Sequence, residues 1–403
     1  MLKKINVKDI KQGMYLQEIC GSWMQHPFWK KSFALTDPKD VKTLQECGIH
    51  EVWIDTGKGL DIEAIVHAES EEESSRKVAD NLQTANSDVK PVPRISLQEE
   101  VAQARKIHGK AAQAVTSMFQ EARMGKALQL VEIVTLVDEI NLSISRNPEA
   151  FLSLSRLKNK DNYTYLHSVA VCALMIALGK QMNLDPSLMK DLGMAGLLHD
   201  VGKMMVPDDI LNKPERLSDE EFTVVKSHPL QGWEMLKLSE GAGAMALDVC
   251  LHHHERVDGT GYPHRLSGDS LSLFARMGAV CDVYDAITSN RCYKAGWEPA
   301  EAIRKMAEWQ EGQFDKTVFH AFVKTIGIYP SGTLVKLKSD RLAVVIQQSE
   351  KSLLTPVVKV FFSTKNNAPV QTETIDLAHA KDSILSAEDP LKWGFDLRKL
   401  TGI

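Results

Sequence analysis

The middle of the chain repeats apolar residues at helical spacing, and this pattern constrains the fold more than any other feature. From about residue 161 to 327, apolar residues recur every three or four positions, which predicts helices packed around a shared core. Ser218 and Glu221 are spaced as a capping box at the start of the third helix. The predicted helices span residues 163–182, 186–199, 219–227, 241–254, 271–289 and 298–311. The region 161–327 is therefore expected to form an all-helical central domain.

The N-terminal residues carry a different pattern. Short alternating runs near residues 14–19 and 51–54 predict a small α+β domain over residues 1–67. Residues 68–95 are charged and polar and end in a Pro-x-Pro, so they predict a linker.

Residues 96–160 predict helices that connect the linker to the central domain. Ser96 and Glu99 are spaced as a capping box. An apolar stripe follows, made of Val101, Ala104, Ala111, Val115, Met118 and Ala122. Such a helix packs on its own domain or pairs with its copy in a homodimer, and the first arrangement is the more common one.

The C-terminal residues 328–403 predict a small β-containing segment, because three β-like runs occur at residues 333–338, 342–347 and 357–362. At 403 residues, the chain is too long for one ordinary hydrophobic core. The expected fold class is mainly α, with small β-containing units at both ends.

Charge and hydropathy exclude several classes of protein. The formal net charge of −5 disfavours binding to a nucleic-acid polymer, which needs a basic face. The longest apolar run, residues 169–178, is about half a bilayer span, so no membrane span is expected. The N-terminus lacks a signal peptide's apolar core, and the six cysteines show no metal-type pairing. We therefore expect a cytoplasmic protein with reduced thiols.

Histidines are concentrated in the central domain. Seven of the 13 histidines lie between His167 and His264. A lone histidine is usually structural or solvated, but several of these stand beside carboxylates. His199 and Asp200 are adjacent on a predicted helix, with Lys203 one turn further on, and imidazole with carboxylate suits iron, manganese or zinc. The alternative is an ordinary helix end whose lysine complements the helix dipole.

The sequence HHHERVDGTGYP, residues 252–263, is the second cluster. Three successive histidines on a helix cannot all face one way, so we expect two ligands and one outlier. Asp258, Gly259, Gly261 and Pro263 predict a rigid turn where backbone can approach a ligand. The alternative is a basic helix end followed by an ordinary loop.

Further residues with this chemistry flank the two clusters. Asp282 and Asp285 lie three apart on one predicted helix, so both carboxylates can point into the same pocket. Arg291 and Lys294 follow, and such cations suit a phosphate ester, although a solvated helix end would also contain them. His167 and His228 would be unremarkable in isolation.

Together these residues resemble the HD-GYP subfamily of HD-domain phosphohydrolases over about residues 161–327. The matching stretches are DNYTYLHS, LLHDVGK, PDDILNKPERLSDEEF, KSHPLQG, HHERVDGTGYP, VCDVYDAITSNRCY and FD. The N-terminal segment is similar to the short domain of unassigned role that often precedes HD-GYP modules.

The resemblance implies a metal-dependent phosphodiesterase that hydrolyses cyclic di-GMP in bacterial signalling. It implies catalytic roles for Asp200 and Lys203, with Lys203 beside the scissile phosphate. The metal ligands it implies are His167, His199, Asp200, His228, His253, His254 and Asp282, which leaves His252 as the outlier. Substrate contacts are expected from Lys203, Asp285, Arg291, Lys294, Gly261, Tyr262 and Pro263.

One position departs from the family pattern. Members with three metals carry a glutamate four residues before the first histidine, where this chain has Tyr163. We therefore expect two divalent ions, iron or manganese with zinc as an alternative, bridged by Asp200 and a hydroxide that attacks phosphorus. The expected product is linear pGpG, with slow or absent further hydrolysis to GMP.

Two other functions fit the same residues. The substrate could be another cyclic dinucleotide or a nucleotide, because base specificity is not visible in these motifs. The protein could also be a catalytically idle scaffold that binds cyclic di-GMP and signals through partner proteins. The complete ligand set argues against an idle site.

Overall fold

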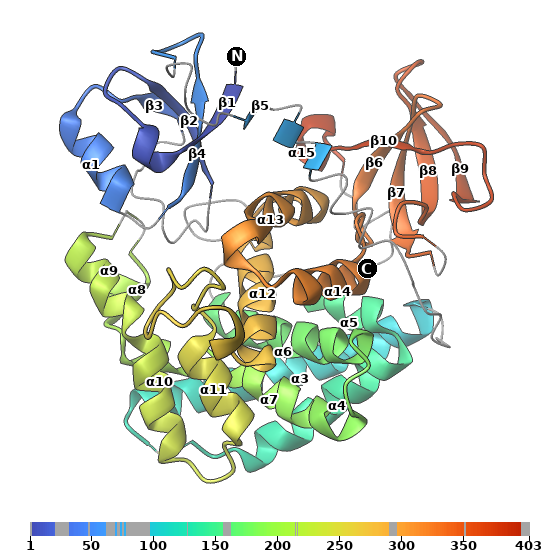
Figure 1. The fold of residues 1–403 in the computed structure, drawn as a ribbon. Coiled ribbons are helices and arrows are strands. Elements are labelled where there is room, and N and C mark those ends of the chain that lie inside the picture. The colour runs from blue at the N-terminus through green and yellow to red at the C-terminus, as the bar shows by residue number, and fades with distance from the viewer. Residues whose placement is uncertain are drawn as a thin grey trace. The chain divides into compact units, whose positions relative to one another are not determined.

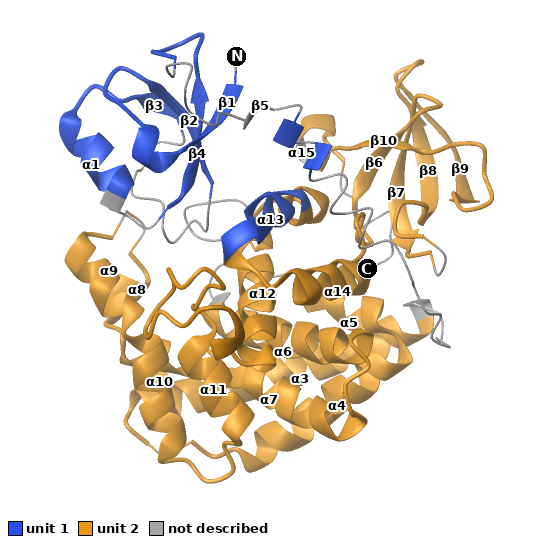
Figure 2. Cartoon of the chain, viewed as in Figure 1, with its two compact units in different colours: residues 1–83, 304–312 blue, residues 84–303, 313–403 orange. Residues whose placement is uncertain are grey.

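The structure is a computed structural model of the chain (Figure 1). It describes residues 2–20, 32–46, 49–61, 69–70, 73–74, 76–77, 97–126, 128–155, 163–213, 215, 217–289, 296–349 and 352–395. The chain divides into two compact units (Figure 2), formed by residues 1–83 with 304–312 and by residues 84–303 with 313–403.

The first unit contains a five-stranded sheet with the strand order β3-β2-β4-β1-β5, and the neighbouring strands are antiparallel. Its elements are β1 (Leu2–Asn6), the 3-10 helix η1 (Val7–Asp9), β2 (Tyr15–Cys20), β3 (Phe33–Ala34), α1 (Pro38–Glu46), β4 (Glu51–Asp55) and β5 (Glu69–Ser70). The predicted α+β character is confirmed. The structure adds β1, and it places β5 inside the predicted linker, most of which lies outside the described residues.

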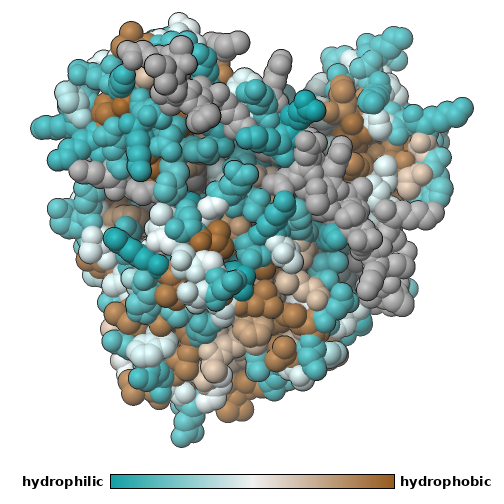
Figure 3. Space-filling view, in the orientation of Figure 1, coloured by the Kyte–Doolittle hydropathy of each residue, from teal (hydrophilic) through white to brown (hydrophobic). Residues whose placement is uncertain are grey.

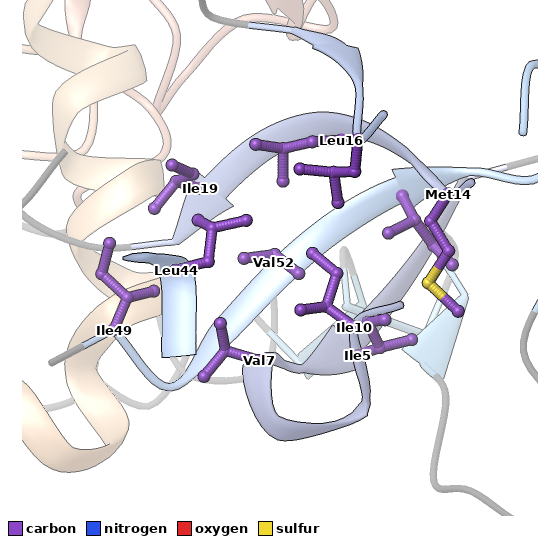
Figure 4. Close-up of a cluster of buried hydrophobic side chains, with 11 residues drawn as sticks. Ile5, Val7, Ile10, Met14, Leu16, Ile19, Leu44, Ile49 and Val52 are labelled. Atoms are coloured by element: carbon purple, nitrogen blue, oxygen red, sulfur yellow. The ribbon is translucent and has the colours of Figure 1, made fainter. Parts of the chain in front are cut away.

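Alternation along the strands explains how this sheet closes a core. In β4, Val52 and Ile54 are fully buried, and Leu16 of β2 pairs with Ile54. These side chains join apolar residues from β1, η1 and α1 in one cluster (Figure 4). One face of the sheet is therefore apolar and covered, as the period of two in the sequence requires.

The second unit is built mainly of helices. They are α3 (Leu97–Arg123), α4 (Val131–Arg146), α5 (Pro148–Ser155), α6 (Tyr163–Gln181), η4 (Pro186–Leu188), α7 (Met189–Leu198), η5 (Val201–Met205), α8 (Asp208–Leu211), α9 (Asp219–Lys226), α10 (His228–Lys237), α11 (Ala244–His252), η6 (Gly268–Ser270), α12 (Leu273–Thr288), α13 (Pro299–Gln313), α14 (Lys316–Ile326) and α15 (Pro390–Trp393). The second half of α13 belongs to the first unit. The predicted helical domain is confirmed, as is the capping box of Ser218 and Glu221.

Helix α6 is the centre of this unit. Every residue from 166 to 179 is buried, because α3, α5, α7, α12 and α14 surround the helix. A helix that is apolar on all sides has no solvent face, so any polar residue on it must find partners inside the protein. This places His167 in the interior.

The predicted connecting helices pack on the helical unit. Ala104, Ala111, Val115, Met118 and Ala122 of α3 are buried, as the apolar stripe predicts, and α3 contacts α4, α5 and α6. The stripe therefore faces its own domain. Ser96, the first residue of the predicted capping box, lies outside the described residues.

A second sheet, with the order β10-β6-β7-β8-β9, forms the C-terminal part of this unit. Its strands are β6 (Leu334–Leu337), β7 (Arg341–Gln347), β8 (Val357–Ser363), β9 (Ala368–Asp376) and β10 (Ile384–Ala387). The first three confirm the predicted runs. Strands β9 and β10 escape sequence analysis because they form the two edges of the sheet and lack a buried apolar face.

None of the described helices is both long enough and apolar enough to cross a membrane. On the face drawn in Figure 3, apolar residues are interspersed with hydrophilic ones.

A buried ion pair joins α3 to α4. Glu100 is 2% exposed and accepts hydrogen bonds from Ser143 at 2.7 Å and from Arg146 at 2.7 and 2.8 Å. Replacing Glu100 with alanine leaves both donors without this acceptor. We expect E100A to lower the free energy of unfolding by about 2 kcal/mol. This loss is smaller than that for breaking a fully buried ion pair, because the Arg146 side chain is 38% exposed.

Urea unfolding followed by circular dichroism measures this loss. The matched control is E139A, which removes the exposed ion pair of Lys110 and Glu139 between the same two helices and is expected to cost less than about 0.5 kcal/mol. Equal losses in the two variants would contradict the assignment of this stability to the buried pair.

Candidate metal centre

The seven predicted metal ligands converge from separate elements of the helical unit. His167 comes from α6, His199 and Asp200 follow α7, and His228 begins α10. His253 and His254 follow the end of α11, and Asp282 lies on α12. All seven are buried.

The local structure at His199 and Asp200 differs from the predicted helix. Helix α7 ends at Leu198, His199 is its C-cap, and Asp200 has a non-helical backbone before η5. Lys203 lies on η5, and its ammonium donates to Asp200. The chain changes direction at this point, so both side chains can enter the same interior site.

The ligand atoms form two groups. His167, His199 and Asp282 make up one, and Asp200, His228, His253 and His254 make up the other. In each group the candidate ligand atoms lie within 4.8 Å of one another.

Asp200 joins these groups. Its Oδ2 lies 3.4 Å from Nε2 of both His167 and His199. Its Oδ1 lies 3.3 Å from Nε2 of His228 and 3.7 Å from Nε2 of His253. The two oxygens of one carboxylate therefore face different sets of imidazoles, which is the arrangement of a bridging ligand.

Backbone carbonyls orient three of the imidazoles. The Nδ1 of His199 donates to the carbonyl of Gly196 at 2.8 Å, and that of His228 donates to Val225 at 2.7 Å. The Nδ1 of His253 donates to Val249 and Cys250, both at 3.0 Å. Whenever such a ring is neutral, it presents an unprotonated Nε2 to the interior.

Asp285 orients His167 in the same way. Its carboxylate lies 2.6 Å from Nδ1 of His167, while Nε2 of that ring lies 2.9 Å from Asp282. Asp285 is buried and also accepts from the hydroxyl of Ser289 at 3.4 Å. This contact supports a positioning role for Asp285, and its predicted contact with substrate stays a prediction.

The electrostatics favour ionised carboxylates and mostly neutral imidazoles. Burial would raise the pKa of Asp200, but the positive charges of Lys203 and His199 outweigh it and hold the pKa well below its usual range. Burial lowers the pKa of His228, and it lowers that of His253 to about 4. His199 is the exception, because the nearby Asp200 and Asp282 overcome burial and raise its pKa to about 10.

These side chains fit bound cations. The Nε2 atoms of His228 and His253 face each other at 3.4 Å although each ring already donates through Nδ1. Within the described part of the chain, Asp200 Oδ1, Asp282 Oδ2 and His254 Nε2 are buried without a hydrogen-bond partner. Buried lone pairs that face one another are costly unless a cation lies between them. Imidazole nitrogen and carboxylate oxygen suit first-row divalent metals.

Two family models match the chain. Residues 2–133 match a domain of unknown function (DUF3391), and residues 142–318 match the HD domain. The chain is 51% identical to the cyclic di-GMP phosphodiesterase PA4108 of Pseudomonas aeruginosa over 398 residues, which cover 98% of this chain and 94% of the relative. The chain belongs to the HD-GYP family of HD-domain phosphohydrolases.

Other relatives match a smaller part of this HD-GYP protein. A cyclic di-GMP phosphodiesterase of Vibrio cholerae is 38% identical over 43% of the chain and 38% of the relative. The 3'3'-cGAMP-specific phosphodiesterase 1 of the same organism is 32% identical over 43% of the chain and 41% of the relative.

The GYP loop, residues 261–263, is attached to the candidate metal centre through a backbone hydrogen bond and a ring stack. The Tyr262 amide donates to the carbonyl of His254 at 3.2 Å, and the two rings stack at 4.8 Å between centroids. A Cβ on Gly261 would lie 2.4 Å from Cα of Glu255, so only glycine fits there. Pro263 follows with a cis peptide bond.

Glu255 is a functional candidate that the sequence analysis missed. This buried carboxylate accepts from the backbone amides of His264 at 2.6 Å and Leu266 at 3.1 Å. It therefore fixes the backbone that follows the GYP loop, and it stands directly after two of the predicted ligands in the sequence. A carboxylate immediately after a histidine run, before a glycine-rich turn, is the signal that could have identified it.

The structure places His252 away from both ligand groups. Its Nδ1 lies 2.8 Å from Asp248, and its Nε2 lies 3.2 Å from Nδ1 of His264. Asp248 also accepts from Ser272, which joins α11 to the start of α12. This contact set is outside the metal centre.

Three predicted residues lack a described side chain. Arg291 and Lys294 lie outside the described residues. Tyr163 is the first residue of α6, and its side chain lies outside the described part.

Gly202 sets the distance between η5 and α10. A Cβ on this residue would lie 1.9 Å from the carbonyl oxygen of His228 and 2.5 Å from the amide nitrogen of Gly232. We expect G202A to displace His228, to lower the free energy of unfolding by about 3 kcal/mol and to reduce the metal content of the purified protein. Thermal unfolding and elemental analysis measure the two effects.

The matched control is G243A. Gly243 has a φ of −68°, and an added Cβ would meet nothing within 4 Å. A G202A protein that melts and retains metal like G243A would contradict the proposed steric constraint.

Proposed function

We propose that this HD-GYP protein is a metal-dependent phosphodiesterase that hydrolyses cyclic di-GMP to linear pGpG. The observation that carries the proposal is the Asp200 carboxylate between two sets of buried imidazoles. This substrate is supported by relatives that are named cyclic di-GMP phosphodiesterases, PA4108 above all. The cytoplasmic location and the homodimer or signalling partners remain predictions of the sequence.

We further propose two divalent ions, iron or manganese, with zinc as the alternative. One would be held by His167, His199 and Asp282, the other by His228, His253 and His254, with Asp200 shared. When bound, such a pair activates water as a nucleophile and neutralises the charge that develops on phosphorus. The replacement of the family's glutamate by Tyr163 supports two ions rather than three.

The residues around this centre have separate tasks in the proposed reaction. Asp285 and the backbone carbonyls hold the imidazole rings in one orientation, which keeps the ligand atoms in place. Lys203 is half-buried beside Asp200, so its ammonium can stabilise charge on a phosphate oxygen or on the leaving oxygen. Arg291, Lys294 and the GYP loop, Gly261 to Pro263, would hold the rest of the nucleotide.

A second substrate is also supported. The relative specific for 3'3'-cGAMP supports a mixed adenine-guanine dinucleotide, which has the same phosphates and differs in one base. If metal-loaded protein binds a dinucleotide and never cleaves it, the protein is a catalytically idle scaffold.

The test is an assay of protein purified anaerobically and loaded with Fe(II) or Mn(II). We expect cyclic di-GMP to be consumed faster than its mixed analogue, with pGpG as the accumulating product by chromatography. D200A should lower the rate roughly a thousandfold or more, because it removes the shared ligand. The control is D209A, which removes an exposed carboxylate on α8.

Three results would count against parts of this proposal. Rapid appearance of GMP would contradict the single cut, and faster turnover of the mixed dinucleotide would change the substrate. A D200A protein as active as D209A would remove the metal centre from the mechanism.

The contact between Asp285 and His167 gives an independent test of the ligand set. D285N keeps the shape of the side chain but loses the charge that fixes the ring tautomer. We expect it to weaken Mn(II) binding by roughly 10- to 100-fold in a calorimetric titration. D248N changes the matching contact with His252 and is expected to leave Mn(II) affinity unaltered. Equal affinities in the two variants would contradict ligation by His167.

A further inference from the structure

A lysine lies beside the GYP loop, two residues before the predicted ligand His228. Lys226 is the last residue of α9, and its Nζ lies 4.4 Å from the ring centroid of Phe222 and 5.7 Å from that of Tyr262. Tyr262 in turn stacks on His254. A single aromatic ring therefore separates this ammonium from a predicted metal ligand.

Arg265 adds a second positive charge near Lys226. It follows Tyr262 by three residues, in the same loop that Glu255 holds through its backbone. Lys226 contacts the ring of Tyr262 in that same loop, 5.7 Å from its centroid. Neither cation forms an ion pair with a carboxylate in the part of the chain that the structure describes. Two neighbouring cations repel each other unless an anion lies between them.

We propose that Lys226 and Arg265 bind the phosphate of the cyclic dinucleotide that is not being cleaved. This inference rests on the proposed function, because it needs a substrate with two phosphates. One phosphate must bind at the metal centre beside Lys203. The cyclic backbone of the dinucleotide then places the other phosphate outside the metal centre. A phosphate oxygen accepts charge-assisted hydrogen bonds from ammonium and guanidinium groups.

The aromatic contacts explain why Lys226 is suited to this task. The Phe222 and Tyr262 rings hold its ammonium by cation–π attraction and leave its donors free of any carboxylate. The hydroxyl of Tyr262 is buried and has no hydrogen-bond partner among the described residues, so it can also donate a hydrogen bond to a phosphate oxygen of the substrate. The ammonium of Lys226 is therefore held in position before substrate binds.

The experiment compares two substrates in steady-state assays of the metal-loaded full chain. Cyclic di-GMP has two phosphates, and bis(p-nitrophenyl) phosphate has only one. For K226M we expect KM for cyclic di-GMP to rise roughly tenfold with little change in kcat, because one charged contact is lost. The kcat/KM for bis(p-nitrophenyl) phosphate should fall by much less, and K226R should restore most of the KM.

A second variant and a control guard against structural effects. R265G removes the other charge at a residue whose φ of 56° suits glycine, and it should also raise KM for cyclic di-GMP. K237M removes a similar lysine, 4.4 Å from the Trp233 ring on α10, and should change neither substrate.

Each outcome decides between explanations. Equal losses on both substrates in K226M would assign Lys226 to positioning of the GYP loop and overturn the inference. An unchanged KM for cyclic di-GMP in K226M and R265G would overturn it as well. Wild-type protein that cleaves bis(p-nitrophenyl) phosphate but no cyclic dinucleotide would instead overturn the proposed function.

Discussion

The carboxylate of Asp200 is the constraint on which the helical unit depends. A buried carboxylate is costly unless positive charge and hydrogen bonds surround it. Here Lys203 contacts one oxygen, and four imidazoles lie within 3.7 Å of the carboxylate oxygens. Because those imidazoles come from four different elements, the site can form only when α6, α7, α10 and α11 have packed together.

Small residues let these elements approach closely enough. A Cβ on Gly196 would lie 2.8 Å from the carbonyl oxygen of Val171, so α7 and α6 touch through their backbones just where His199 must meet His167. Gly202 does the same for η5 and α10. These glycines lie inside or beside helices, where glycine is otherwise unfavourable, and the close approach is the reason they are suited to these positions.

Sequence alone identified much of this arrangement, for physical reasons. Helical periodicity located α6 and α12, the capping box located the start of α9, and histidine–carboxylate pairing drew attention to the residues that the structure brings together. The predicted helix end at residue 199 agrees with the end of α7, but the non-helical backbone at Asp200 and the 3-10 helix η5 were missed because tertiary contacts set them. Strand β9 was missed because it lies at an edge. Glu255 was missed because its partners are backbone amides, and Lys226 was missed because its contact with Tyr262 joins it to a distant segment.

The charge balance of the centre argues for cations more strongly than its residue types do. Asp200, Asp282 and Asp285 are buried, and Asp282 and Asp285 both lie within hydrogen-bond distance of the His167 ring. Lys203 donates to Asp200. A proton on His199 supplies further positive charge, as its raised pKa indicates. Metal binding requires such ligands to release protons, so the carboxylates that attract a proton to His199 are the same groups that would attract a divalent ion.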